Sequence, residues 1–395
     1  MKQKSNSQHP LLTGCLLLGI AAIPDAMVVP VLKELTVDRF GVSDGTAHLF
    51  MAVNLLGAIL AVGLLVLLNR RFSSSQLVII SALLSSAFMA GMAITTSWWG
   101  MLILRCLEGG ADLVLLAVPL RLIAASGLKE RYAGRMGVGF TVIMVSMALG
   151  VGIGGGFGSK SPIAVLWLGS ASMLLLTLIA AKMHRTVDNV SRSPRPGPNA
   201  CPLIPKEWLG AGFLALDRGL AALVSTSLPI LLASGFNVGA VTLGVALAGM
   251  FLSMAIFAAP IGLLADIYGG NRIRLIAAML SGVSLAALGL MAWLPPVVVL
   301  PPCLLMYGVG AAGLMPSAFS AAVRPEASNL VFGSLQAAGQ GGWALGVLGG
   351  LLVISVIELP AEVMLSRMFP IAGAVYILLN CLILASLRTM EKRAA

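Results

Sequence analysis

Three charged residues, Arg105, Glu108 and Asp112, lie within an apolar stretch from residue 101 to 125. At about 100° per residue, a helix through this stretch would carry all three on one face. A charged group at the centre of a bilayer costs roughly 3 kcal/mol, so three together need a functional reason. A carboxylate can bind a proton, whereas an arginine stays charged. The stretch therefore predicts a polar pathway through a membrane protein.

Two other apolar stretches also contain ionisable residues. Asp25 lies between Pro24 and Pro30, so its carboxylate is expected on a helix that bends. Asp217 and Arg218 are neighbours in the sequence, and adjacent residues on a helix project about 100° apart. These two therefore cannot simply neutralise each other.

The whole chain has the composition of a polytopic membrane protein. Of its 395 residues, 58% are hydrophobic and 10% charged, and the mean hydropathy is +0.99, outside the range of soluble domains. Helices are the expected spanning form, because lipid cannot satisfy open backbone groups and a β-barrel would alternate polarity. We predict an all-α membrane protein with twelve transmembrane helices. They are expected at about residues 11–32, 46–68, 76–96, 99–125, 136–158, 162–182, 208–233, 239–265, 272–294, 297–322, 331–356 and 365–387.

Basic residues predict the orientation of these spans. If both termini and each loop from an even to an odd span share one side, that side holds eighteen lysines and arginines and the other holds four. An excess of this kind marks the cytoplasm. We therefore expect both termini in the cytoplasm and the protein in a plasma membrane, that is, a bacterial inner membrane. The same bias explains the net charge of +10 without a nucleic-acid partner.

Other functional classes find little support. The five cysteines have no paired spacing and only three histidines occur, so we expect neither disulfides nor a metal site. Paired histidines, a nucleophile elbow and a phosphate loop are absent from the sequence, so an enzyme and a cofactor are not expected. No loop is long enough for a nucleotide-binding domain, which argues against an ATP-driven pump.

A pattern of small residues repeats at half the chain length. The pattern occurs between residues 137 and 155 and again between residues 333 and 350, which indicates two halves in parallel register. Small residues at this spacing let two helices approach closely or bend. In the first half the pattern consists of Gly137, Ser146, Gly150, Gly154 and Gly155.

The repeat predicts two pseudo-symmetric bundles of six helices. We expect the first bundle at residues 1–182 and the second at 207–395. Residues 183–206 contain a cluster of prolines and charges, which opposes a folded core and predicts a cytoplasmic linker.

Three motifs resemble signatures of the major facilitator superfamily of secondary transporters. The sharpest consists of Gly262, Asp266, Gly269 and Arg272, and is similar to the family's loop signature of glycine, aspartate, glycine and basic residues. The equivalent loop of the first half, residues 69–74, lacks the aspartate and the glycine. The resemblance implies that Asp266 caps a helix and holds a cytoplasmic gate closed, in keeping with the attraction of a carboxylate to a helix N-terminus. A turn that merely connects two spans is the alternative.

The other two motifs lie in the fourth and fifth spans. Arg105 followed by Gly109 resembles the fourth-helix signature whose arginine sits near the protonation site of proton-driven members. The small-residue pattern from Gly137 to Gly155 resembles the fifth-helix motif of antiporters, although Val151 replaces the usual proline. The resemblance also implies a central cavity lined by the first, fourth, seventh and tenth helices.

The candidate site follows from these placements. Burial away from water favours the neutral form of a carboxylate and a nearby arginine favours the charged form, so protonation would respond to which side is open. Asp112 could instead pair with Arg121. The proton-coupling candidates are Asp25, Glu108, Arg105 and Asp112. The substrate-cavity candidates are Asp25, Arg105, Glu108, Asp217, Arg218 and Tyr307.

The same residues could instead have purely structural roles. Arg105 and Glu108 could form a fixed ion pair that stabilises the bundle. Asp217 and Arg218 could belong to a salt bridge between the bundles.

The sequence thus favours a proton-coupled carrier that exports a small lipophilic or amphipathic compound by alternating access. The expected partners are that substrate, protons and the lipid bilayer, with the protein as a monomer. A proton-coupled importer of a small metabolite and a non-transporting membrane sensor or assembly protein on the same fold are the alternatives.

Overall fold

The computed structural model describes residues 8–31, 34–42, 49–126, 131–158, 161–191, 205–228, 231–232, 236, 240–322, 329–356 and 359–394. Throughout these ranges the secondary structure is helical, and no strand occurs in them. Local sequence signals explain several helix ends. Helix α1 ends at Met27, shortly after Pro24. The side chains of Ser73 and Ser97 accept hydrogen bonds from backbone amides in the first turns of α4 and α5.

Twelve long helices run through the described part of the chain, which confirms the predicted fold class. Five short helices accompany them: η1 (Val29–Val31), η2 (Glu34–Asp38), α8 (His184–Ser191), η4 (Leu223–Ser227) and η5 (Leu288–Ala292). The long helices are α1 (Gln8–Met27), α3 (Leu49–Arg71), α4 (Ser74–Ile94), α5 (Trp98–Ala125), α6 (Tyr132–Gly158), α7 (Pro162–Lys182), α9 (Pro205–Ala222), α11 (Ala240–Tyr268), α12 (Gly270–Ala287), α13 (Pro296–Ala322), α14 (Asn329–Val356) and α15 (Ala361–Ala394).

Most of these helices have the length and hydropathy of membrane spans. Among the described residues, ten segments meet both requirements, although no membrane is part of the structure. The helix α5 is long enough, but Arg105, Glu108, Asp112 and Arg121 lie on it. These charges set α5 apart from the ten segments.

The chain divides into two compact units of helices. The helices α6 and α14 are each shared between the two units. Much of the predicted linker, residues 192–204, lies outside the described residues. The first unit consists of residues 1–129, 142–202 and 325–340, and the second of 130–141, 203–324 and 341–395.

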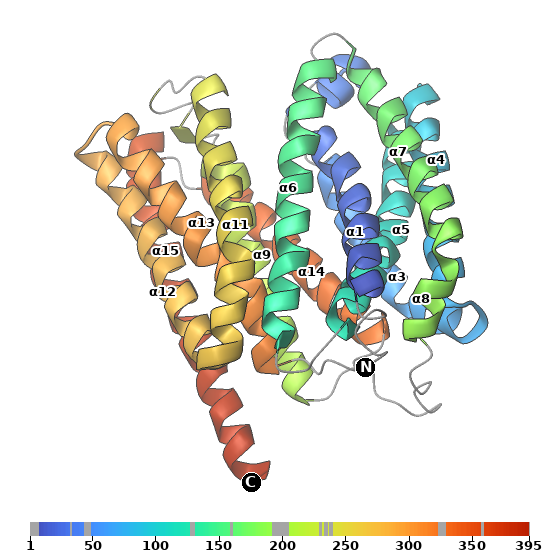
Figure 1. Cartoon of the computed structure of the whole chain (residues 1–395). Helices are drawn as coiled ribbons and strands as arrows, with labels where there is room; N and C mark the ends of the chain where they lie inside the picture. The colour runs from blue at the N-terminus through green and yellow to red at the C-terminus, as the bar shows by residue number, and fades with distance from the viewer. Residues whose placement is uncertain are drawn as a thin grey trace. The chain divides into compact units, whose positions relative to one another are not determined.

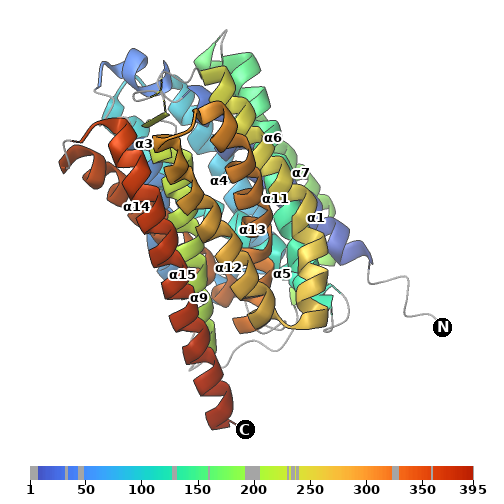
Figure 2. The same ribbon diagram turned by 90° about the vertical axis from the view of Figure 1, so that its left-hand side faces the viewer.

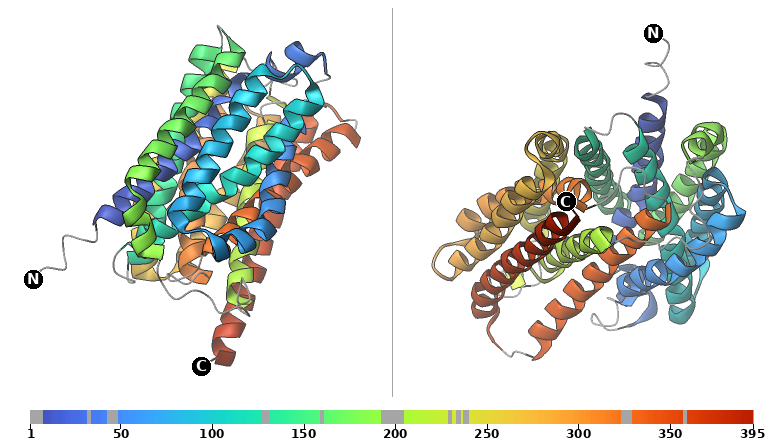
Figure 3. Two further views of the ribbon diagram at one scale, coloured as in Figure 1. Left: turned by 90° about the vertical axis from the view of Figure 1, so that its right-hand side faces the viewer. Right: turned by 90° about the horizontal axis from the view of Figure 1, so that it is seen from below.

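In the first unit, α5 is the helix around which α1, α3 and α4 pack. Figure 3 shows these helices in blue to green in its left panel. The approach of α3 to α5 is especially close, because a Cβ at Gly109 would overlap the backbone carbonyl of Asn54. Glycine at this position therefore brings the polar side chain of Asn54 beside Glu108, the residue preceding Gly109.

In the second unit, α12 packs against both α13 and α15, and α9 packs against the same two helices. Figures 1 and 2 show this group of four from two directions. The side chain of Arg274 is fully buried on α12. Arg274 is one of the eighteen basic residues that the sequence places on the cytoplasmic side, but its guanidinium lies inside the helix bundle rather than at the surface.

The repeated small residues perform the same packing in both halves of the chain. On α6, a Cβ at Gly154 would overlap the backbone of Met27 at the end of α1. On α14, a Cβ at Gly346 would overlap the carbonyl of Gly219 on α9. The fifth long helix thus approaches the first as the eleventh approaches the seventh. This equivalence supports the pseudo-symmetry inferred from the sequence.

Candidate functional site

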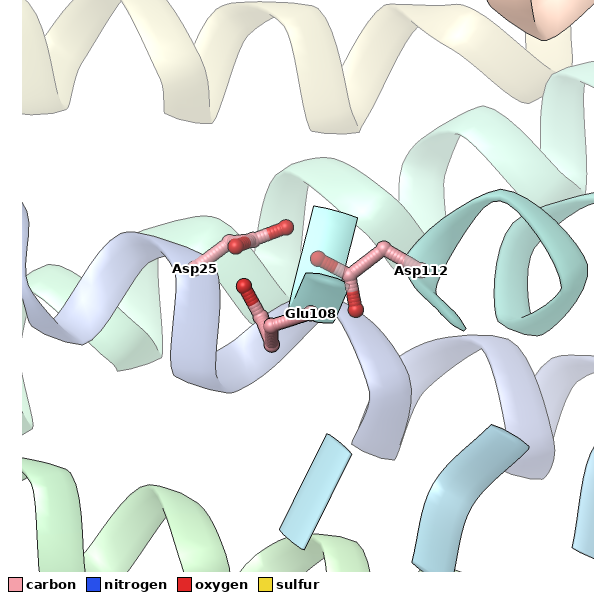
Figure 4. A group of neighbouring side chains, drawn as sticks. All are labelled: Asp25, Glu108 and Asp112. Carbon is pink, nitrogen blue, oxygen red and sulfur yellow. The ribbon is translucent and has the colours of Figure 1, made fainter. Parts of the chain in front are cut away.

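Three carboxylates converge inside the first unit. Asp25 comes from α1, and Glu108 and Asp112 come from successive turns of α5. One oxygen of each lies within 4.8 Å of an oxygen of the other two, and Figure 4 shows the three side chains turned toward one another. Asp25, which lies 83 and 87 positions before the other two carboxylates, thus forms a single group with them.

Arg105 is the cation of this group. Its side chain is 1% exposed, its Nη1 donates to Glu108 Oε2, and its Nη2 donates to Asp25 Oδ1 at 3.1 Å. The guanidinium carbon also lies 5.0 Å from the centre of the Phe50 ring, a cation–π contact from α3. One arginine therefore joins carboxylates from two helices.

Two polar side chains complete the group, and the sequence did not single them out for it. Asn54 Nδ2 on α3 donates to Glu108 Oε2 at 2.9 Å and to Asp112 Oδ2 at 3.4 Å. Ser85 Oγ on α4 donates to Glu108 Oε1 at 3.4 Å. Asn54 could have been found, because it is a lone asparagine in an apolar span. Nothing in the sequence distinguished Ser85 from the other serines of α4.

The charges of this acidic group do not balance. Three carboxylates surround one guanidinium, so with every group ionised two negative charges remain in excess in a largely buried site. Glu108 is 1% exposed, whereas the Asp25 side chain is 37% exposed. An uncompensated buried charge is costly. The arrangement therefore favours uptake of a cation, and it has one accessible member.

A metal ion is one cation that three carboxylates can hold. Arg105, however, donates to two of the three, so its guanidinium occupies the position from which a metal would bind them. A proton needs only one oxygen and no rearrangement of the arginine. The donor set thus fits a proton better than a metal ion.

A second ionic group lies in the second unit. Arg274 donates to both carboxylate oxygens of Asp217 at 2.6 and 2.5 Å, and to Asn380 Oδ1 and the Leu314 carbonyl. Tyr376 donates its hydroxyl proton to Asp217 Oδ1 at 2.7 Å. Four helices, α9, α12, α13 and α15, meet at this network. The sequence did not identify the partners of Asp217, because Arg274 and Tyr376 lie 57 and 159 residues further along the chain.

Arg218 and Tyr307 lie beside this network. Arg218 follows Asp217 on α9, and Tyr307 lies on α13. Tyr307 is 1% exposed. Both residues were substrate-cavity candidates, and they lie on two helices that pack against each other in the second unit.

The loop motif forms a helix cap. Both oxygens of Asp266 accept hydrogen bonds, each 2.7 Å long, from the backbone amides of Ala133 and Gly134 in the first turn of α6. Gly269 has a φ of 92°, which favours glycine at the turn between α11 and α12. Arg272 is exposed. A carboxylate at the positive end of the α6 dipole is the arrangement that the resemblance implied.

A bundle of long apolar helices with ionisable side chains held in its interior is the architecture of a membrane carrier. Residues 14–347 match the Major Facilitator Superfamily. The chain therefore belongs to this superfamily, and it is an integral, multi-pass membrane protein and a secondary transporter.

Among solved structures, the fold is similar to that of the human organic anion transporter MFSD10 (TETRAN), with a TM-score of 0.73. The two sequences are 16% identical, and the alignment covers 96% of this chain and 99% of the human one. At this identity the similarity establishes a shared fold. No curated protein matches the chain.

Proposed function

We propose that the protein is a proton-coupled antiporter that exports a small amphipathic compound from the cytoplasm by alternating access. The observation that carries this proposal is the excess of carboxylates around Arg105: Asp25, Glu108 and Asp112 share a single guanidinium. Such a group gains stability when it takes up a proton, and loses that gain when water or another cation reaches it.

The individual residues have different roles in this proposal. Asp25 is the accessible carboxylate, through which a proton exchanges with the aqueous side. Glu108 is the buried carboxylate, and its hydrogen bonds from Asn54 and Ser85 keep it oriented toward Arg105. When Glu108 is protonated, Arg105 can turn fully to Asp25. Protonation of Glu108 thus changes the partners of Arg105 from Asp25 and Glu108 together to Asp25 alone.

The fixed ion pair between Arg105 and Glu108 is the competing interpretation. It explains the contact between these two residues. It does not explain why Asp112 is buried beside them, because a stabilising ion pair needs no third carboxylate. A group built only for stability would be expected to balance its charges.

Direction and sidedness follow from two features of the sequence. Export in exchange for protons is supported by the small-residue pattern of α6, which resembles the antiporter motif. The distribution of basic residues supports cytoplasmic termini and a location in the bacterial inner membrane. In that orientation the cap formed by Asp266 on α6 lies on the cytoplasmic side, where it would favour closure. Import of a small metabolite with protons is the second candidate.

A test of proton coupling compares Glu108→Gln with wild type in proteoliposomes that contain a pH-sensitive dye. Compounds that raise the melting temperature of the purified protein are added outside, and proton movement is recorded. We expect wild type to move protons when a transported compound is added, and Glu108→Gln to exchange substrate with little or no proton movement, because its side chain cannot ionise. The same substitution at Glu362, which is exposed on α15, serves as the matched control.

Unchanged proton movement in Glu108→Gln would remove this residue from the coupling mechanism. Proton movement that is lost equally in Glu362→Gln would show a general effect on the protein. The direction of the recorded pH change, together with the direction of the substrate gradient, separates antiport from symport.

A further inference from the structure

Arg218 is a cation next to Asp217 in the sequence, and the carboxylate of Asp217 is already bonded to other residues. Asp217 accepts two hydrogen bonds from Arg274 and a third from Tyr376. Its negative charge is matched by that of Arg274, with which it forms a bidentate ion pair. Within the second unit, the charge of Arg218 is therefore in excess, the opposite of the situation around Arg105.

Among the described residues, Arg218 forms no hydrogen bond and no salt bridge. A guanidinium has five N–H donors and keeps its charge under all physiological conditions. On an apolar helix in a membrane protein, such a cation marks a substrate or ion pathway or has a partner. Since no described residue supplies that partner, a bound ligand can.

Tyr307 has a similar deficit. Its side chain is 1% exposed, and no hydrogen bond of its hydroxyl occurs among the described residues. The hydroxyl is not one of the fully buried polar atoms that lack a partner, so it remains accessible to a ligand. Helix α13, which carries Tyr307, packs against α9, which carries Arg218. Two packed helices thus each carry a donor without a partner in the described part of the chain.

We propose that Arg218 and Tyr307 together bind the anionic oxygen group of the transported compound, which makes that compound an amphipathic organic acid. Arginine is suited to hold both oxygens of a carboxylate, and the tyrosine hydroxyl can donate to one of them. The proposal rests on the proposed transport function and names the chemical class of its substrate. It excludes a lipophilic cation, which Arg218 would repel.

The two charged groups then have separate tasks. The acidic group around Arg105 exchanges protons, and the donors of Arg218 and Tyr307 hold the acid. A cationic substrate would instead be expected to compete for Asp25, Glu108 and Asp112. The chemical class of the substrate is therefore decided by which of the two groups binds it.

The experiment measures thermal stabilisation of the purified protein in detergent by matched compounds. Each set has one aryl-alkyl skeleton in three forms, such as 4-phenylbutyrate, its primary amide and the corresponding amine, over a range of chain lengths and ring systems. We expect acids to raise the melting temperature of wild type and the amides and amines to do so weakly or not at all. In Arg218→Gln the apparent dissociation constant for the best acid should rise about tenfold or more, since a charge-assisted pair is lost.

Tyr307→Phe guards against a variant that fails to fold. Removal of a hydroxyl that makes no hydrogen bond among the described residues should leave the melting temperature of the ligand-free protein unchanged, yet weaken binding of the acid about threefold or more. Arg388→Gln, at an exposed position of α15, is the matched control for Arg218→Gln and should bind the acid as wild type does.

Stabilisation of wild type by amines or amides instead of acids overturns the proposal, as does a panel in which no acid stabilises it. Equal binding of the acid by wild type, Arg218→Gln and Tyr307→Phe also overturns it. Binding in detergent needs neither a membrane nor a proton gradient. Failure here therefore leaves proton coupling untouched, and failure of coupling in proteoliposomes leaves the binding result intact.

Discussion

Arg105 and Arg274 are both buried arginines, but they use their donors differently. Arg274 makes five hydrogen bonds, to Asp217, Asn380 and the Leu314 carbonyl, so its fork is fully satisfied. Arg105 donates to Asp25 and Glu108, and its Nε has no partner among the described residues. A saturated arginine is suited to hold four helices in place. An incompletely bonded one, among surplus carboxylates, is suited to change partners.

This difference predicts unequal costs for removing one carboxylate. Asp217→Asn leaves the fully buried Arg274 without its counter-ion, and breaking a buried pair in this way costs about 3–5 kcal/mol. Asp25→Asn is the matched change and should cost much less, because Arg105 retains Glu108 and Asp25 is partly exposed. Melting temperatures in detergent measure both variants. Similar losses in the two would contradict the distinction between a structural and an exchangeable ion pair.

At the scale of elements, α6 shows how glycine spacing determines which face of a helix can approach a neighbour. A Cβ at Gly154 would overlap the Met27 carbonyl of α1, whereas a Cβ at Gly152 meets nothing within 4 Å. The two positions differ only in the direction they face. Small residues therefore matter where α6 approaches a neighbour, as Gly154 does with α1 and Gly137 with Ala258 of α11. At Gly152, glycine carries only its usual entropic cost.

We accordingly expect Gly154→Ala and Gly152→Ala to have opposite effects. Gly154→Ala should lower the melting temperature and slow transport, because α1 must move away and it carries Asp25. Gly152→Ala should raise the stability slightly, by about 0.5–1 kcal/mol, since alanine favours a helix more than glycine does. Thermal unfolding and substrate flux in proteoliposomes provide the two measurements. A Gly154→Ala protein as stable and active as Gly152→Ala would show that the close approach is not needed.

At the scale of the whole molecule, transport requires at least two states of similar free energy. The cap of Asp266 on the first turn of α6 is a contact that one state can make and another can lose. The corresponding loop of the first half has neither the aspartate nor the glycine, and there Ser73 and Gln76 form a capping box for α4 instead. The two halves therefore differ in what their loops can hold.

Asp266→Asn should shift the balance between these states. Asparagine keeps the size of the side chain but loses the charge, and a charge at a helix N-terminus contributes about 0.3–2 kcal/mol. We expect faster amide hydrogen exchange at Ala133 and Gly134, and a changed apparent affinity for substrate. Asp188→Asn is the control, since Asp188 also accepts bonds from a helix terminus, at Ser75 of α4, but is not part of the loop motif. Unaltered exchange at Ala133 and Gly134 would argue against a latch.

The sequence also shows where prediction from local pattern ends. It identified Asp25, Arg105, Glu108 and Asp112 as one group, because charges in apolar spans are rare enough to attract attention individually. It counted Arg274 among the basic residues of the cytoplasmic side, since a charge near the end of an apolar run looks the same in sequence whether it faces water or a buried aspartate. It passed over Ser85, Tyr376 and Asn380 as ligands of charges, because a single polar residue in a span carries no record of its partner.

By itself the sequence determined the membrane environment, the twelve helices, the repeat of the two halves and the rarity of its charged positions. These properties follow from hydropathy and spacing along the chain, which need no knowledge of distant contacts. Only the tertiary structure decided which charges pair: that Asp217 belongs to Arg274, that Arg105 serves carboxylates in excess, and that Arg218 and Tyr307 keep unused donors. Pairing depends on which helices pack together, and that is a property of the folded bundle rather than of any one span.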